Sequence, residues 1–259
     1  MSTYRLPHDL AGEQQRLALM SALLDPIERV YIERLGVGPG WRCLELGSGN
    51  GSIAKILAEL VGPSGHVVAS DIDIGYMAEL KTPRLEVRRI DVLKDEIEAG
   101  FYDFVVARAL LHHLPLARNA LERMVAAVKP GGAFLSIEPD MLPATVAEPE
   151  PMRLFWQAWL RWSENSGIDY FIGRKMPAWL DSVGLQSVGG EGHTAHFNGG
   201  SDWATYWTST LSELAPSLMK SGFMTKPMLD DCYAHYEDPR YWTSIMTFTA
   251  SWGRKPAER

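Results

Sequence analysis

The sequence has little cysteine, no basic block and no long apolar run. Its 259 residues include two cysteines, Cys43 and Cys232, which make neither a disulfide framework nor a metal-ligand cluster. Scattered lysines and arginines leave a net charge of −7, with no basic stretch for a phosphate backbone. No stretch reaches the roughly 18 uninterrupted apolar residues of a membrane helix, and the first residues lack a signal-peptide core. These absences predict a soluble, cytoplasmic protein with no metal, nucleic-acid or membrane partner.

A glycine-rich turn within residues 41–53 is the most informative stretch of the chain. Alternating leucines before the turn fit a buried strand, whereas apolar residues after it recur at helical spacing. Such a turn presents backbone N–H groups and a helix N-terminus to a ligand, and both favour a carboxylate or phosphate. The turn therefore predicts a nucleotide-cofactor site. Three glycines allow the chain to turn tightly: Gly47, Gly49 and Gly51.

Spacing separates two cofactor classes that use such turns. A dinucleotide motif, G-x-G-x-x-G, would need its third glycine at position 52, where this chain has Ser52. The pattern here is G-x-G-x-G preceded by Glu45. Asp71 lies 20 residues beyond Gly51 and follows a predicted strand, where it can accept both hydroxyls of a ribose. Asp91 follows the next predicted strand and offers an acceptor for an adenine amino group.

This E-x-G-x-G-x-G turn with Asp71 and Asp91 resembles the class I S-adenosylmethionine-dependent methyltransferases over residues 36–140. It is most similar to bacterial small-molecule enzymes that tailor natural products. The resemblance implies that the glycine turn lies against the methionine part of the cofactor, Asp71 binds the ribose, and Asp91 with Val92 frames the adenine. The expected cofactor-binding residues are Tyr4, Arg16, Glu45, Gly47, Ser48, Gly49, Gly51, Asp71, Ile72, Asp91, Val92, Ala107 and Arg108.

The order of predicted elements indicates an α/β fold. We expect a Rossmann-like, seven-stranded, mostly parallel sheet with helices on both faces and an antiparallel last strand. Residues 1–259 should form a single domain with a cofactor-binding core at 36–140. After the strand that ends near Leu46, the expected strands are residues 66–70, 85–90, 102–107, 133–137, 185–188 and 244–250.

Residues 1–35 are expected to form a helical cap over the cofactor cleft. Apolar residues recur at spacings of three or four, and we expect two helices broken at Asp25-Pro26, where Asp25 can cap the second and Pro26 begin it. In related enzymes an N-terminal helix often closes this cleft. The candidates to touch the methionine moiety are Tyr4, Glu13 and Arg16. The alternative is that Glu13 and Arg16 form a solvated helix face and that Tyr4 belongs to a frayed end.

Two segments rich in tryptophan should cover the active site, at residues 141–172 and 189–243. The first carries a helix with Trp156 and Trp159 on one face, and the second starts a helix with Trp203, Tyr206 and Trp207. Either these rings fill a core, or they form an apolar or aromatic acceptor pocket. The expected substrate-binding residues are His113, Trp156, Trp159, Trp203 and Trp207.

His113 is the candidate catalytic base, because it follows the fourth strand at the cleft and imidazole titrates near neutral pH. His112 should face elsewhere, and a purely structural histidine is the alternative. No third ligand stands near the pair at a metal-binding spacing, so we expect no metal. The weaker candidates are Glu138, Asp140, His193 and His196.

We therefore expect transfer of a methyl group from S-adenosylmethionine to a hydroxyl, amine or carbon of a small, apolar or aromatic metabolite, with S-adenosylhomocysteine as the product. The alternative is a protein that uses S-adenosylmethionine structurally or electrostatically without methyl transfer. A nicotinamide oxidoreductase is disfavoured by Ser52. The sequence determines neither the methyl acceptor nor the oligomeric state, for which a homodimer is one of the open alternatives.

Overall fold

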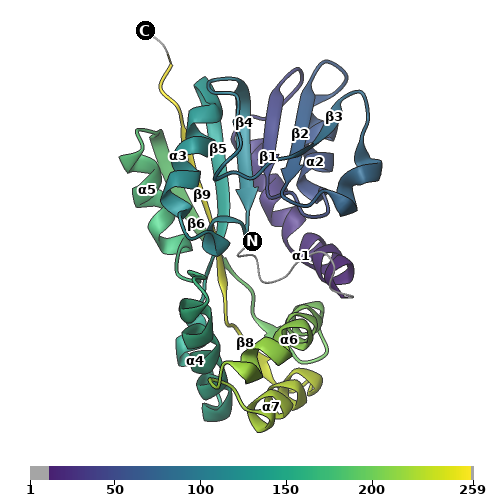
Figure 1. Ribbon diagram of the computed structural model, residues 1–259, viewed down its shortest axis with the longest axis vertical. Helices are drawn as coiled ribbons and strands as arrows, with labels where there is room; N and C mark the ends of the chain where they lie inside the picture. The colour runs from purple at the N-terminus through teal and green to yellow at the C-terminus, as the bar shows by residue number, and fades with distance from the viewer. Residues whose placement is uncertain (1–11, 258–259) are drawn as a thin grey trace.

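A seven-stranded sheet forms the centre of the computed structural model, which describes residues 12–257 (Figure 1). The strand order is β3-β2-β1-β4-β5-β9-β6, and β9 runs antiparallel to both of its neighbours. All other pairings are parallel, which confirms the expected Rossmann-like α/β fold. The strands are β1 Arg42–Leu46, β2 His66–Asp71, β3 Leu85–Arg89, β4 Tyr102–Arg108, β5 Val128–Asp140, β6 Gln186–Thr194 and β9 Thr247–Arg254.

The last two strands differ from the expected ranges. β9 pairs Thr247 with Asp140 and Arg254 with Ala133, so it begins and ends later than residues 244–250. β6 continues to Thr194, well beyond position 188. Backbone hydrogen bonds to the neighbouring strands decide where β9 begins and ends, and an apolar pattern in the sequence does not reveal these bonds. The segment inserted between the two strands consequently begins after Thr194.

Helices cover both faces of the sheet. Cys43 of β1 packs in the same core as α2 (Ser52–Val61), while its neighbour Leu44 packs in the core beneath α3 (Ala117–Ala127) and α5 (Met176–Ser182). This alternation follows from the two-residue period of a strand. Short 3-10 helices complete the layers: η1 Gly75–Leu80, η2 Leu111–His113, η3 Pro143–Val146 and η4 Gly173–Lys175.

A single helix, α1 (Glu13–Arg34), precedes the sheet, so the expected break at Asp25-Pro26 is wrong. Proline removes one intrahelical hydrogen bond. Tertiary contacts hold the helix together across that gap, because Leu24 and Tyr31 are buried in the core and Asp25 forms an ion pair with Arg108. Asp25 therefore ties the helix to the sheet instead of capping a new one.

Three helices form a layer at one end of the molecule, α4 (Glu150–Asn165), α6 (Asp202–Lys220) and α7 (Lys226–Glu237) (Figure 1). A two-stranded sheet joins them, β7 Phe197–Asn198 with β8 Trp242–Thr243. Trp156, Trp159 and Trp207 meet edge to face here, with ring centroids 5.1–6.1 Å apart, and each is at most 2% exposed. Buried aromatic rings contribute large apolar areas, so this cluster stabilises the layer.

Candidate active site

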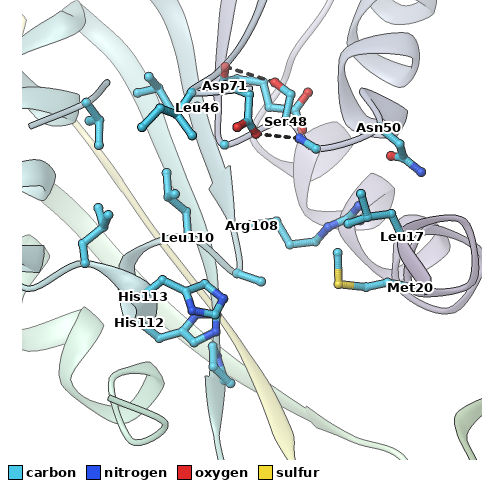
Figure 2. A pocket seen from close by; sticks show the side chains of 18 of the residues that line it. Leu17, Met20, Leu46, Ser48, Asn50, Asp71, Arg108, Leu110, His112 and His113 are labelled. Atoms are coloured by element: carbon cyan, nitrogen blue, oxygen red, sulfur yellow. Dashed lines mark hydrogen bonds between the residues drawn. The ribbon is translucent and has the colours of Figure 1, made fainter. Parts of the chain in front are cut away.

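A cavity of about 410 Å³ lies at the carboxyl ends of the parallel strands. Its walls come from α1, from the loops that follow β1 to β4, and from α6. Figure 2 shows the side of α1, of the glycine turn and of the two histidines. Ligands of open α/β sheets bind at this edge, where the strand order reverses between β1 and β4. The cavity is therefore the candidate active site.

The glycine turn forms the first wall of the cavity. Gly47 and Gly49 line it with φ of +72° and +54°, a conformation that disfavours any side chain. A Cβ atom on Gly47 would lie 2.9 Å from the side chain of Leu110 across the cavity. Gly51 lies behind the wall, at the N-cap of α2, so it shapes the turn without reaching the cavity.

Asp71 stands at the end of β2 and faces the same wall. Its Oδ2 accepts the N–H of Gly49 at 2.9 Å (Figure 2). Its Oδ1 accepts the N–H of Asp73 at 3.1 Å. Asp71 lines the cavity, and a carboxylate is a good acceptor for the hydroxyl groups of a ligand. Ile72 lies beside it on the cavity wall, as expected.

Asp91 and Val92 line the cavity after β3, together with Ile90, Leu93 and Lys94. Lys94 Nζ donates to Asp91 Oδ2 at 2.6 Å, and this bond is the main cause of the lowered pKa of Asp91. Asp91 is therefore ionised at neutral pH. The remaining lone pairs of the carboxylate can accept an amino group.

A buried group of charges lies beneath the glycine turn. Arg108 Nη1 donates to Asp25 Oδ1 at 2.6 Å and to Glu28 Oε2 at 3.1 Å, and its Nη2 donates to Ser52 Oγ at 3.0 Å. Burial raises the pKa of Glu28 to about 7 and that of Glu45 to about 8, while the charge of Arg108 opposes both shifts. Arg108 thus joins α1, β4 and the start of α2.

The end of β4 turns sharply into the cavity wall. Ala107, an expected cofactor contact, is fully buried and does not line the cavity. Ala109 lines it instead, with a φ of +50° that is unusual for a residue other than glycine. This turn sends the chain back over the cavity, so the residues after Ala109 form its second wall.

His112 and His113 lie together on this second wall, with ring centroids 3.8 Å apart (Figure 2). The expectation that His112 faces elsewhere is wrong, because the one-turn helix η2 brings both rings to the cavity. Burial lowers the pKa of His112 to about 3. Burial, with the neighbouring charges of His112 and Arg16, also places the pKa of His113 well below its ordinary value. Both imidazoles are therefore neutral at pH 7.

The four weaker candidates for the catalytic base lie in different surroundings. Glu138 is fully buried behind η2, and its Oε2 lies 3.0 Å from Nδ1 of His112. Asp140 is buried too, but Arg174 binds both of its oxygens at 2.5 and 2.7 Å. His193 and His196 are exposed and do not line the cavity. The sequence predicts the position of Glu138 near the strand end, but not the side chain that Glu138 contacts.

Aromatic and apolar side chains form the far wall of the cavity. Tyr206 and Trp207 come from α6, Tyr170 from the loop before η4, Met246 from the position before β9, and Phe248 from β9 itself. Most of these residues were missed, because an apolar strand or loop residue carries no signal of facing a ligand. Tyr206 and Trp207 could be found because they belong to the aromatic group at the start of α6.

Of the four tryptophans expected to bind substrate, Trp207 alone lines the cavity. Trp156 and Trp159 are fully buried in the helical layer, so for them the core role is the correct one. Trp203 stacks on Phe248, with ring centroids 5.8 Å apart, and supports the wall from behind. Helical spacing places rings on one face, but cannot say whether a core or a ligand covers that face.

Arg16 of α1 lines the cavity and is buried, so a solvated helix face is excluded. Its Nε and Nη2 donate to both oxygens of Glu13, at 2.7 and 2.8 Å, and its Nη1 donates to the hydroxyl of Tyr206 at 3.3 Å. Arg16 therefore joins α1 to α6 at the cavity. Tyr4 lies outside the described residues.

Residues 12–257 bring together no group of three or more His, Cys, Asp or Glu side chains that could hold a metal ion. No helix in this range is long and apolar enough to cross a membrane.

Comparison with protein families adds independent information. Residues 7–188 match the model of a family described as a methyltransferase domain. The ubiquinone/menaquinone biosynthesis C-methyltransferase UbiE of Ectopseudomonas mendocina is 31% identical over 120 residues, which cover 43% of this chain and 46% of that enzyme. The chain thus matches less than half of the length of this curated relative.

Solved structures share the fold. A phosphoethanolamine N-methyltransferase 2 of Haemonchus contortus, solved with phosphomonomethylethanolamine and S-adenosylhomocysteine, aligns with a TM-score of 0.57 and 17% identity, covering 94% of this chain and 52% of that one. The [4+2]-cyclase SpnF aligns with a TM-score of 0.53 and 15% identity, covering 90% of this chain and 81% of its own. At these identities the likeness extends to the fold alone.

Proposed function

Because this chain belongs to the methyltransferase-domain family, we propose that it transfers a methyl group from S-adenosylmethionine to a small, apolar or aromatic metabolite. The product of the cofactor would be S-adenosylhomocysteine. The observation that carries the proposal is the continuity of one cavity, from Asp71 and the glycine turn at one end to His113 and Trp207 at the other. A donor and an acceptor bound in one cavity are aligned for in-line transfer.

The residues present fit an adenosine with an amino-acid tail. Asp71 places a carboxylate on the cavity wall, the group expected to accept the ribose hydroxyls, and Ile72 and Val92 offer apolar surface to the adenine. Gly47 and Gly49 keep the wall free of side chains where the methionine part would lie. When bound, S-adenosylmethionine supplies an electrophilic methyl group on a sulfonium, and the protein supplies alignment and a proton acceptor.

The far wall supports the acceptor class. Its aromatic and apolar residues favour a ligand with apolar surface, and few polar groups interrupt them. Both His112 and His113 reach the cavity and can take a proton from a hydroxyl, an amine or an activated carbon. We also propose that the segments 141–172 and 195–246 cover the active site, and that the enzyme works in the cytoplasm on natural-product-like metabolites, either alone or as a homodimer.

Two measurements test the function. Calorimetry should show binding of S-adenosylmethionine and S-adenosylhomocysteine and none of NAD. Incubation with 1,4-dihydroxynaphthalene, catechol and tryptamine, one acceptor at a time, should then form S-adenosylhomocysteine with at least one. NAD binding without any response to S-adenosylhomocysteine would contradict the proposal.

A second candidate is a protein that binds S-adenosylmethionine without transferring its methyl group. The observation that favours it is the shared fold with a [4+2]-cyclase, since this fold alone does not fix the reaction. The same incubations separate the two functions. Tight cofactor binding with no S-adenosylhomocysteine formed from a broad acceptor panel would favour the second.

A further inference from the structure

Glu138 is a fully buried carboxyl near the end of β5 that accepts three backbone hydrogen bonds and contacts one imidazole nitrogen. Its Oε1 accepts the N–H groups of Leu110 and Leu111 at 3.1 and 2.8 Å. Its Oε2 accepts the N–H of His112 at 3.3 Å and lies 3.0 Å from Nδ1 of the same residue. Three backbone donors already surround this carboxyl, so it serves His112 as an acceptor.

This contact fixes which nitrogen of His112 carries the proton. The ring is buried and neutral at pH 7, and a neutral imidazole has one N–H and one lone pair. Because Nδ1 faces an acceptor, Nδ1 carries the hydrogen and Nε2 keeps the lone pair. No group among residues 12–257 bonds Nε2, and His112 lines the cavity. The free lone pair is thus available to a ligand.

The carboxyl also distinguishes the two histidines. Glu138 bonds to His112, and the ring of His113 lies beside that of His112, with centroids 3.8 Å apart and the planes tilted by 39°. Burial raises the pKa of Glu138 to about 7, so above this pH Glu138 is a carboxylate. A protonated His112 would then contact the carboxylate directly, whereas, within residues 12–257, Glu138 forms no hydrogen bond to His113. Since an unpaired buried charge is costly, a proton is more stable on His112.

We propose that Nε2 of His112 accepts the proton of the methyl acceptor and that Glu138 is the positioning residue that holds His112 in the Nδ1–H form. This inference rests on the proposed methyl transfer. The acceptor–hydrogen bond breaks with its electrons left on the acceptor atom, which bonds to the methyl carbon. The carbon–sulfur bond of the donor breaks with its electrons left on sulfur. The proton bonds to Nε2, and the imidazolium later loses it to water.

The first test observes the tautomer and needs no acceptor. Full-length protein labelled with ¹⁵N-histidine and saturated with S-adenosylhomocysteine is examined by two-bond ¹H–¹⁵N correlation NMR, and the His112 signals are assigned from H112N. We expect Nδ1–H in the wild-type protein. In E138Q the amide nitrogen donates where Oε2 accepted, so His112 should switch to Nε2–H. An Nε2–H form in the wild type, or no switch in E138Q, would overturn the inference.

The second test compares turnover in a matched pair of variants. H112N keeps a donor toward Glu138 but lacks the Nε2 lone pair, and H113N is its control. Each is assayed for S-adenosylhomocysteine formation with 1,4-dihydroxynaphthalene, catechol and tryptamine. H112N and E138Q should slow turnover by roughly 10²–10⁴-fold with nearly unchanged S-adenosylhomocysteine affinity, and H113N should slow it much less.

The outcomes separate the inference from the function on which it rests. A wild-type protein that forms S-adenosylhomocysteine while H112N keeps near-normal turnover, or while H113N loses as much as H112N, contradicts the role of His112. A wild-type protein that binds the cofactor but transfers no methyl group contradicts the proposed function. In that case the tautomer measurement still decides the geometry claimed for His112 and Glu138.

Discussion

Arg108 Nη1 lies 2.6 Å from Asp25 Oδ1, and this ion pair joins the end of β4 to the middle of α1. The same guanidinium reaches Glu28 of α1 and Ser52 at the start of α2. Arg108 therefore holds together α1 and β4, which both line the cavity, and the start of α2 behind the glycine turn. α1 also contributes Leu17 and Met20 to the cavity, so its position determines the shape of the cofactor site.

Arg108→Met should lower the free energy of unfolding by about 3–5 kcal/mol, the range for breaking a buried ion pair. The change leaves Asp25 and the fully buried Glu28 without their cation. Urea unfolding measures the effect. Arg29→Met is the matched control, because Arg29 pairs with Glu33 and Glu59 on the exposed side of the same helix and should matter little. Equal losses in the two variants would contradict a special role for Arg108.

Stability should fall as the pH rises from about 6.5 to about 8. Burial raises the folded pKa of Glu45 to about 8 and those of Glu28 and Glu138 to about 7, above their ordinary value of 4.5. Throughout this window the unfolded chain has already released these protons. The folded chain loses those of Glu28 and Glu138 near pH 7 and that of Glu45 near pH 8, so the stabilisation that the bound protons give is lost as the pH rises. The lowered pKa of His112 acts only below pH 6.5, in the opposite direction. Unfolding midpoints at several pH values measure the slope, which should be smaller in Glu45→Gln.

Asp71→Ala should weaken binding of S-adenosylhomocysteine by about 1.5–3 kcal/mol, the range for losing hydrogen bonds to a charged group. The change removes the proposed ribose acceptor and also frees the N–H of Gly49. Calorimetry measures the affinity. Asp73→Ala is the control, because Asp73 is exposed and does not line the cavity. A greater loss in Asp73→Ala would mean that the wrong carboxylate had been assigned to the ribose.

Gly47→Ala should weaken cofactor binding, whereas Gly62→Ala should not. Both glycines have positive φ, +72° and +62°, so both variants should lose about 1–2 kcal/mol of stability from backbone strain. The added methyl group at position 47 lies 2.9 Å from Leu110, which would have to move within the cavity. At position 62 nothing lies within 4 Å of the added carbon. Thermal melts measure the stability lost through backbone strain in both variants. Calorimetry with S-adenosylhomocysteine measures the affinity, which only the loss of cavity space at position 47 should lower.

Trp207→Phe should raise the KM for the methyl acceptor by about 10-fold, as expected for losing part of an apolar contact. Trp156→Phe should lower the stability and leave that KM nearly unchanged. Both rings are almost fully buried in one cluster, but only Trp207 of the two lines the cavity. Steady-state kinetics with the best acceptor of the panel, next to urea unfolding, measures both effects. A change of KM in Trp156→Phe alone would reverse the assignment.

Local sequence patterns were sufficient for the cofactor side of the cavity. The turn from Gly47 to Gly51, Asp71 after β2 and Asp91 after β3 all stand where a parallel strand ends, so their positions follow once the strands are recognised. Parallel strands bring their carboxyl ends to one edge of the sheet. The prediction that Ala107 lines the cavity is wrong, because side chains one residue apart along a strand point to opposite faces of the sheet.

The sequence by itself determined the family, the sheet and the positions of the glycine turn, Asp71 and Asp91 at the strand ends, because each depends on residues close together in the chain. Only the tertiary structure decided that α1 continues through Pro26, that Trp156 and Trp159 belong to a core, and that Glu138 meets His112 across 26 positions of the chain. The free energies behind these three features come from contacts between distant segments. A burial or a hydrogen bond of this kind exists only after the chain has folded, so no local spacing encodes it.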